Sequence, residues 1–122
     1  MTRRATILIV DDEPPVRTVL RKILAGAGYE VREAQDGKEA LGQVEHSTID
    51  LVITDLAMPG QEGLETIQIL RQNWPELKII AMTGKSAGSM LHAAEVLGAD
   101  AALAKPMRIH ELLNTIQHLI GT

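Results

Sequence analysis

The stretch Leu51-Val52-Ile53-Thr54-Asp55, followed closely by Met58-Pro59-Gly60, decides how the rest of this chain is interpreted. Four residues with little polar surface end in a carboxylate, and the Pro-Gly pair prevents a strand or helix from continuing. The pattern predicts a buried strand that delivers Asp55 to a loop. Open α/β sheets bind ligands at the carboxyl ends of their strands, so Asp55 is a candidate functional residue. On this stretch alone, a turn-capping role for Asp55 is equally compatible.

Composition limits the classes of protein to which the chain can belong. Its 122 residues predict one domain, covering residues 1–122, with a sizeable core. The net charge of −4, without a basic stripe, argues against direct nucleic-acid binding. The absence of cysteine excludes disulfides and thiolate metal sites. The apolar runs are too short for a bilayer, so we expect no membrane segment, no signal peptide and a cytoplasmic location.

Apolar runs of strand type alternate with segments of helical periodicity along the chain. The expected strands cover residues 6–10, 29–34, 51–54, 77–82 and 101–104, and an expected helix follows each of them. Pro14 and Pro15 suit the first turn of the first helix. Five alternations of strand and helix imply an α/β fold with a parallel sheet, right-handed crossovers and helices on both faces.

Polar residues stand at the ends of four of these five expected strands. They are Asp11 and Asp12, Asp55, Thr83, and Lys105. The carboxyl ends of parallel strands meet at one edge of a sheet, and in the strand order 2-1-3-4-5 the first and third strands are neighbours. With that order, three carboxylates would meet, with a hydroxyl and an ammonium group beside them.

Such a cluster of carboxylates favours Mg²⁺ as a cofactor. Three carboxylates at hydrogen-bonding distance repel one another, so at neutral pH they need a shared proton or a cation. Mg²⁺ takes oxygen ligands, which acids supply, whereas zinc favours His and Cys. One carboxylate could then act as a nucleophile toward phosphorus, while Thr83 and Lys105 stabilise phosphoryl oxygens. For Asp11 and Asp12 taken alone, helix capping is an equal alternative.

Seven motifs together resemble the receiver domain of two-component response regulators. In chain order they are Val10-Asp11-Asp12-Glu13, Asp36-Gly37-Lys38-Glu39-Ala40-Leu41, Asp50-Leu51-Val52-Ile53-Thr54-Asp55, Met58-Pro59-Gly60, Met82-Thr83-Gly84, Gly98-Ala99-Asp100 and Lys105-Pro106. The likeness covers essentially the whole chain in the right order. It implies a flavodoxin-like, doubly wound, five-stranded parallel sheet of order 2-1-3-4-5.

The resemblance also implies the roles of the residues that react. Asp55 accepts a phosphoryl group from a histidine of a partner kinase, and Thr83 moves toward that group after transfer. Lys105 pairs with Asp55 before transfer and with the phosphoryl group afterwards. The bond between Lys105 and Pro106 is cis in the family, and we expect the same here. The chain would thus catalyse only its own phosphorylation and dephosphorylation, and would not turn over a separate substrate.

The same resemblance implies a set of Mg²⁺ ligands. Asp12 binds the ion directly and Asp11 binds it through water. Asp55 and the backbone carbonyl of Ala57 complete the protein ligands.

Two positions depart from the family pattern. Tyr or Phe commonly stands three residues before the lysine, where this chain has Ala102, and Phe often follows the Lys-Pro pair, where it has Met107. A rotating aromatic switch is therefore absent. We expect activation to be read through the segment from Thr83 to Ser89 and the helix after it.

The implied partners are proteins. A sensor histidine kinase or phosphotransfer protein would meet surface residues of the first helix, such as Arg17, Thr18 and Arg21. A downstream protein or output domain would contact the face from Thr83 to Lys105.

Two other functional classes share features of this pattern. A phosphorylation-independent interaction module with the same fold is favoured by Ala102 and opposed by the complete set of site residues. A haloacid-dehalogenase-type phosphatase also uses Mg²⁺ and an aspartyl nucleophile. That family typically has a second Asp two residues after the nucleophile, which Asp55-Leu56-Ala57 and Asp11-Asp12-Glu13 both lack.

Overall fold

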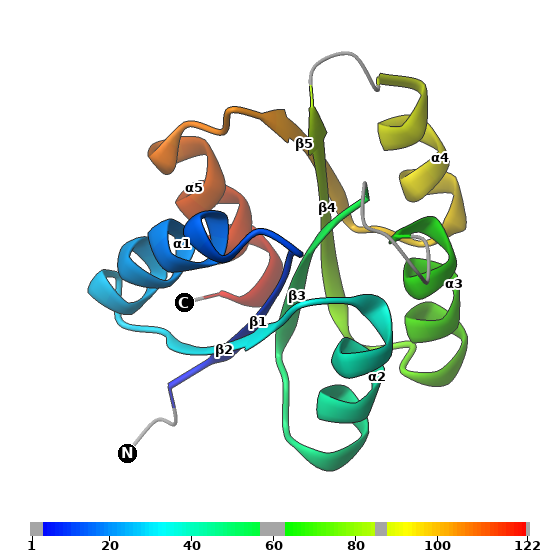
Figure 1. The fold of residues 1–122 in the computed structure, drawn as a ribbon, viewed down its shortest axis with the longest axis horizontal. Coiled ribbons are helices and arrows are strands. Elements are labelled where there is room, and N and C mark those ends of the chain that lie inside the picture. Colours follow the sequence, from blue (N-terminus) through cyan, green and yellow to red (C-terminus); the bar gives the residue numbers. More distant parts are fainter. Residues whose placement is uncertain (1–3, 57–62, 85–87, 122) are drawn as a thin grey trace.

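The computed structural model describes residues 4–56, 63–84 and 88–121, and within them five parallel strands form one sheet with helices on both faces (Figure 1). The strands are β1 (Thr6–Val10), β2 (Glu30–Ala34), β3 (Leu51–Asp55), β4 (Lys78–Gly84) and β5 (Ala101–Lys105). The helices are α1 (Pro14–Gly26), α2 (Gly37–His46), α3 (Gly63–Asn73), α4 (Gly88–Leu97) and α5 (Ile109–Ile120). The order β2-β1-β3-β4-β5 confirms the predicted doubly wound topology, in which β1 and β3 are neighbours.

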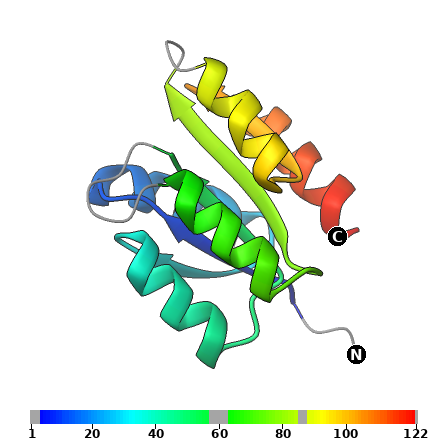
Figure 2. The same ribbon diagram turned by 90° about the vertical axis from the view of Figure 1, so that its right-hand side faces the viewer.

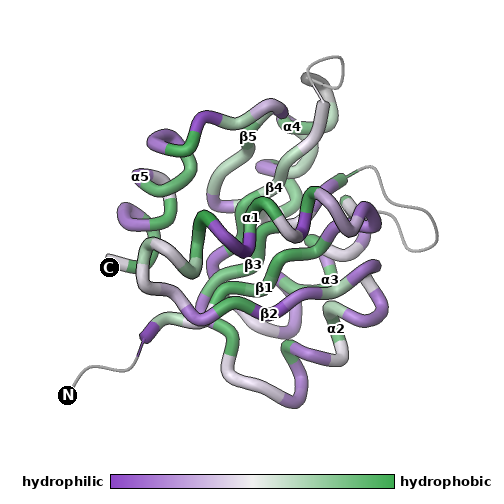
Figure 3. The backbone as a smooth tube through the Cα atoms, turned by 60° about the vertical axis from the view of Figure 1, so that its left-hand side comes forward, coloured by the Kyte–Doolittle hydropathy of each residue, from purple (hydrophilic) through white to green (hydrophobic). Residues whose placement is uncertain are grey.

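Side chains of the central strands enter two separate hydrophobic layers. In β1, Ile7 and Ile9 join a buried cluster with residues of α1 and α5, whereas Leu8 and Val10 join one with residues of α2, α3 and α4. This division follows from the two-residue period of a strand. Figure 1 shows the same arrangement, with α1 and α5 on one side of the sheet and the other three helices opposite. Because both faces are covered, β1 and β3 are apolar almost throughout, as Figure 3 shows by colour.

Strand boundaries differ slightly from those predicted. The second strand starts at Glu30, since the backbone N–H of Tyr29 is used to close the end of α1 by donating to Leu24 O at 3.1 Å. The fourth strand runs on through Thr83 to Gly84, and the fifth includes Lys105. These two polar residues are therefore fixed by the sheet itself.

Figure 2, turned by 90° from Figure 1, shows α2, α3 and α4 lying over one face of the sheet. β5 forms one edge of this sheet and pairs with β4, and all its residues are at least partly exposed. Within the described part of the chain, none of the helices combines the length and apolar character needed to cross a bilayer.

Candidate phosphoacceptor and metal site

The carboxylates of Asp11, Asp12 and Asp55 come together at the carboxyl ends of β1 and β3. One ligand oxygen from each lies within 4.8 Å of the others. Asp11 is 0% exposed and Asp55 is 4% exposed, whereas Asp12 is exposed. The cluster therefore has one side open to solvent and two buried acids behind it. Such an all-oxygen donor set suits a hard divalent cation such as Mg²⁺.

Lys105 reaches this acidic cluster from the end of β5. Its Nζ donates to Asp55 Oδ2 at 3.0 Å and to Asp11 Oδ2 at 3.2 Å. The bond from Lys105 to Pro106 is cis, as predicted. One ammonium group thus bridges the two buried acids, and Asp12 has no hydrogen bond or salt bridge of its side chain to other described residues.

The titration of the site reflects its burial and its crowded charges. Burial raises the pKa of the Asp11 carboxyl above its usual 3.8, and repulsion by Asp55 raises it further. The hydrogen bond from the Glu13 N–H and the charge of Lys105 lower this pKa, but they do not cancel the rise. Burial alone would lower the pKa of Lys105, but hydrogen bonds and attraction from Asp55 and Asp11 outweigh it and raise that pKa above 10.5. The lysine is therefore held charged, while an ionised Asp11 is disfavoured in this setting.

Thr83 lies near the end of the neighbouring strand β4, where it is 2% exposed. Its register partner is Ala104, and the next pair joins Gly84 to Lys105. Asp55 is paired with Met82, the residue before Thr83. The register thus places Thr83 on the strand next to that of Asp55 and Lys105 one strand further out, from which its side chain reaches Asp55. Ala57 and Met58-Pro59-Gly60 lie outside the described residues.

Gly63, at the start of α3, lies close to the backbone of Asp55 and Leu56. A Cβ at this position would lie 2.5 Å from Leu56 Cα and 2.7 Å from Asp55 O. Since these are backbone atoms, a side chain cannot be accommodated without moving the end of β3. The absence of a side chain at Gly63 lets α3 begin directly against Asp55.

Arg17 belongs to the surroundings of this site, although it was predicted to be a surface residue for a kinase. Its side chain is 17% exposed and donates from Nε to Glu33 Oε1 at 3.2 Å and from Nη1 to Asp11 O at 2.5 Å. A signal was available in the sequence: Tyr29, Val31 and Glu33 alternate on one face of a strand, so an acid follows two apolar residues toward α1. Thr18 and Arg21 are exposed, as predicted.

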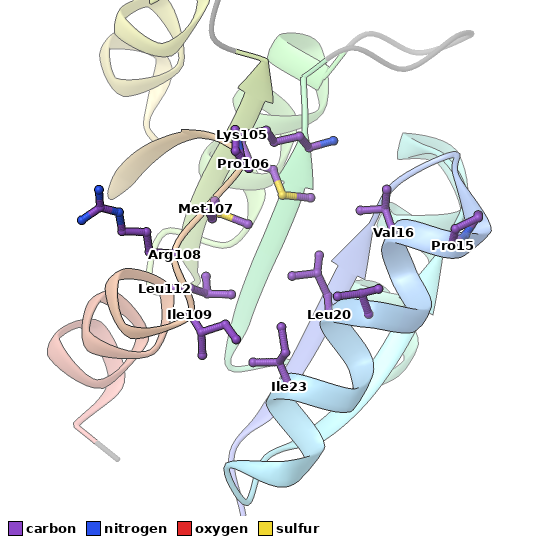
Figure 4. A pocket seen from close by; sticks show the side chains of 12 residues that line it. Pro15, Val16, Leu20, Ile23, Lys105, Pro106, Met107, Arg108, Ile109 and Leu112 are labelled. Atoms are coloured by element: carbon purple, nitrogen blue, oxygen red, sulfur yellow. The ribbon is translucent and has the colours of Figure 1, made fainter.

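An apolar groove of about 530 Å³ lies beside Lys105, between α1 and the segment that joins β5 to α5 (Figure 4). Met107 lines it together with Val19 and Ile109, which are 57% and 52% exposed. On the other side of β5, Ala102 is half-buried against the cluster that includes α4. The two departures from the family pattern therefore lie on opposite faces of the sheet.

Comparison with characterised proteins identifies the family. The model of the response regulator receiver domain matches residues 7–117. Response regulator MprA of Mycolicibacterium vanbaalenii is 40% identical over 114 residues, covering 93% of this chain and 49% of MprA. The Mycobacterium leprae MprA is also 40% identical over 114 residues, covering 93% of this chain and 50% of that protein. The chain spans about half the length of these relatives.

Solved structures agree with the sequence comparison. The response regulator TrrA of Thermotoga maritima, solved in complex with Mg²⁺-BeF, is 36% identical and has a TM-score of 0.86, covering 94% of this chain and 98% of that one. A putative response regulator of Chloroflexus aurantiacus is 35% identical with a TM-score of 0.92, covering 98% and 100%. By sequence and by fold, this chain belongs to the response regulator receiver domain family of two-component systems.

Proposed function

We propose that this receiver is a phosphoacceptor switch in which Asp55 takes a phosphoryl group from a histidine of a sensor kinase or phosphotransfer protein. The observation that carries the proposal is the bridge formed by Lys105 between Asp55 and Asp11, in a cluster where the Asp12 carboxylate lies within 4.8 Å. A nucleophilic carboxylate, an ion site and a fixed cation are thereby gathered at one strand edge. The domain proposed for this role covers residues 1–122, in the cytoplasm.

Mg²⁺ is the proposed cofactor, and the residues present fit it. The donors are carboxylate oxygens, Lys105 balances only part of their charge, and Asp11 has a raised pKa because of burial. Asp11, Asp12 and Asp55 would hold the ion, together with the backbone carbonyl of Ala57. When bound, Mg²⁺ supplies positive charge that neutralises phosphoryl oxygens and helps to orient them.

The side chains of the protein carry the remaining steps. A carboxylate oxygen of Asp55 attacks phosphorus as the bond from phosphorus to the donor imidazole nitrogen breaks, and the imidazole leaves. Lys105 then transfers its hydrogen bond from Asp55 to a phosphoryl oxygen, and the Thr83 hydroxyl donates to another. Attack of water on phosphorus later restores the Asp55 carboxylate and releases phosphate. Asp55 is thus modified and restored in each cycle, and the protein turns over no separate substrate.

Partner recognition is proposed for two faces. The donor protein would approach over α1, where Thr18 and Arg21 are exposed and where Val16, Val19 and Ile23 line the apolar groove. The downstream partner or output domain would contact the face from Thr83 to Lys105, through α4 and β5. With Ala102 in place of an aromatic ring, the change at Thr83 would be read through the segment to Ser89, of which residues 85–87 lie outside the described chain.

A second candidate is a receiver that binds partners without phosphorylation. The observation in its favour is Ala102, whose methyl group cannot perform the ring movement that many receivers couple to the threonine. The two candidates differ in whether Asp55 becomes modified, which can be measured directly.

The test is intact mass after incubation with acetyl phosphate, with and without Mg²⁺. We expect a labile adduct of one phosphoryl group that requires Mg²⁺ and is missing in Asp55→Asn. Asp36→Asn is the matched control, because it makes the same carboxylate-to-amide change at the N-cap of α2, where Asn caps equally well. If no adduct forms while Mg²⁺ binds, and beryllofluoride is not bound either, the phosphorylation-independent module replaces this proposal.

A further inference from the structure

Arg17 links the acidic cluster to the neighbouring strand. Its Nη1 donates to the backbone carbonyl oxygen of Asp11 at 2.5 Å, while its Nε donates to Glu33 Oε1 at 3.2 Å. The first contact is with the main chain between the two acids of the β1 end, and not with a carboxylate. Arg17 therefore acts on the course of the backbone at the site.

The carbonyl that Arg17 holds determines where Asp12 points. It belongs to the planar peptide unit that joins Asp11 to Asp12, so fixing the oxygen also fixes the orientation of the Asp12 N–H and the start of its side chain. The Asp11 carboxylate has its own restraints, the Glu13 N–H at 2.9 Å and Lys105. The Asp12 carboxylate has no comparable side-chain contact with the described residues. Its place depends on the backbone.

Glu33 fixes the position of Arg17. The Glu33 backbone is held by pairing with Ile9 in β1 and by Gln43 of α2, whose Nε2 donates to Glu33 O at 2.6 Å. The Glu33 carboxylate also accepts from Arg21 Nε at 2.6 Å. The guanidinium group of Arg17 is thus held toward the Asp11 carbonyl by Glu33, whose single negative charge is shared between Arg17 and Arg21.

We propose that Arg17 is a positioning residue for Mg²⁺, because it holds the peptide between Asp11 and Asp12 in the orientation that brings the Asp12 carboxylate to the other two acids. This inference rests on the proposed function of the acidic cluster as an Mg²⁺ site. It assigns Arg17 to the metal site and not to the kinase-facing surface, where the sequence had placed it.

The direction in which Mg²⁺ affinity changes when Arg17 is replaced distinguishes a positioning role from a purely electrostatic one. Removing a positive charge near an acidic cluster strengthens cation binding by reducing repulsion. Removing a group that orients metal ligands weakens binding, typically by about 10-fold to 100-fold. Arg21 provides the matched control, since it pairs with the same Glu33 carboxylate but does not hold the Asp11 carbonyl.

The experiment is calorimetric titration of the metal-free protein with MgCl₂ for wild type, Arg17→Gln and Arg21→Gln at one pH and ionic strength. We expect Arg17→Gln to weaken Mg²⁺ binding by about 10-fold, and Arg21→Gln to leave it within about twofold or to strengthen it. Arg17→Lys keeps the charge and one donor that can reach the carbonyl, so it should fall between wild type and Arg17→Gln. Urea unfolding of each variant verifies that the titrated protein is folded.

A second measurement needs no metal. Amide hydrogen exchange at Asp12 and Glu13, followed by NMR in metal-free protein, should accelerate in Arg17→Gln and not in Arg21→Gln. Equal Mg²⁺ affinities in the two glutamine variants, or tighter binding by Arg17→Gln, would overturn the inference while leaving the proposed function intact. Absence of Mg²⁺ binding by the wild type would overturn both.

Discussion

The two ends of the strands, which we call the carboxyl edge and the amino edge of the sheet, use charge in opposite ways. At the carboxyl edge, Asp11, Asp12 and Asp55 are gathered around Lys105, and Asp12 remains exposed. At the amino edge, Arg71 donates to the backbone carbonyls of Pro75, Leu77 and Gly98 and forms a 2.7 Å salt bridge with Asp100.

The charged groups at the amino edge contact backbone atoms of several elements, whereas Lys105 at the carboxyl edge contacts carboxylates. Asp100 also accepts from the N–H of Ile79 at 2.8 Å, so Arg71 and Asp100 together tie the end of α3 to the starts of β4 and β5. The amino edge is closed by these contacts. The carboxyl edge concentrates like charges, which costs stability but leaves oxygen atoms available to a cation. The Arg71–Asp100 contacts and the acidic cluster therefore lie at opposite ends of the strands.

The largest effect is expected at the amino edge, from Arg71→Met. The change leaves three backbone carbonyls without the donor that Arg71 supplies and removes the salt bridge of Asp100, which keeps the hydrogen bond from the Ile79 N–H, so we expect a loss of about 3 kcal/mol in the free energy of unfolding. Urea denaturation measures it. Arg21→Met is the control, because it removes an exposed salt bridge and should cost less than about 1 kcal/mol. Mg²⁺ affinity should be unchanged in folded Arg71→Met; a loss of affinity would show that the two edges are not independent.

The next largest effect is expected from Gly63, and the comparison with Gly42 tests the packing of α3 against the end of β3. Gly63→Ala places a methyl group against the backbone of Asp55 and Leu56, and should destabilise the protein by about 2 kcal/mol. Gly42→Ala in α2 meets nothing within 4 Å and should stabilise it by about 0.5 to 1 kcal/mol. Thermal unfolding of both variants compares them. Equal shifts would mean that α3 can move away from β3 without loss.

The smallest effect should be a gain in stability from Asp11→Asn at neutral pH without Mg²⁺, by up to about 1 kcal/mol. The variant replaces a buried carboxyl group whose pKa is raised by desolvation. Adding MgCl₂ should stabilise wild type more than the variant. Urea denaturation across a pH series provides the measurement.

The pH dependence of Asp11→Asn has a definite sign. A carboxyl whose pKa is raised on folding binds more protons in the native than in the unfolded state, so its contribution to stability falls as the pH rises from 3.8 through the raised value. The difference in the free energy of unfolding between Asp11→Asn and wild type should therefore shrink as the pH is lowered through this window. A difference that is constant with pH would contradict the assignment of the gain to the charge of Asp11.

The sequence was sufficient for the fold because several independent patterns agree. Apolar runs, Pro14 and Pro15 at a helix start, and glycine or proline at helix ends all predicted the same alternation, and the resemblance supplied the strand order. Residues at the ends of strands were also predictable, since parallel strands expose their carboxyl ends at one edge. Asp11, Asp12 and Asp55 meet for that reason.

Arginine contacts with the main chain could not be predicted in the same way. Arg17 and Arg71 each reach carbonyl oxygens that carry no sequence signature, and Arg71 connects to Gly98 across 27 residues. Helical spacing gives the direction of a long side chain only approximately, so Arg17 was assigned to the surface. The acid at Glu33, on the α1-facing side of its strand, was the available clue to its inward position.

The position of Lys105 on β5 has a mechanical consequence. β5 is paired along one side, and each of its residues is at least partly exposed, so displacing it disturbs less packing than displacing β1 or β3. The ammonium group that contacts Asp55 is thus attached to the outer strand of the sheet, whereas Asp55 stands at the end of a fully buried central strand. We therefore expect a change of charge at Asp55 to displace β5 more than β3.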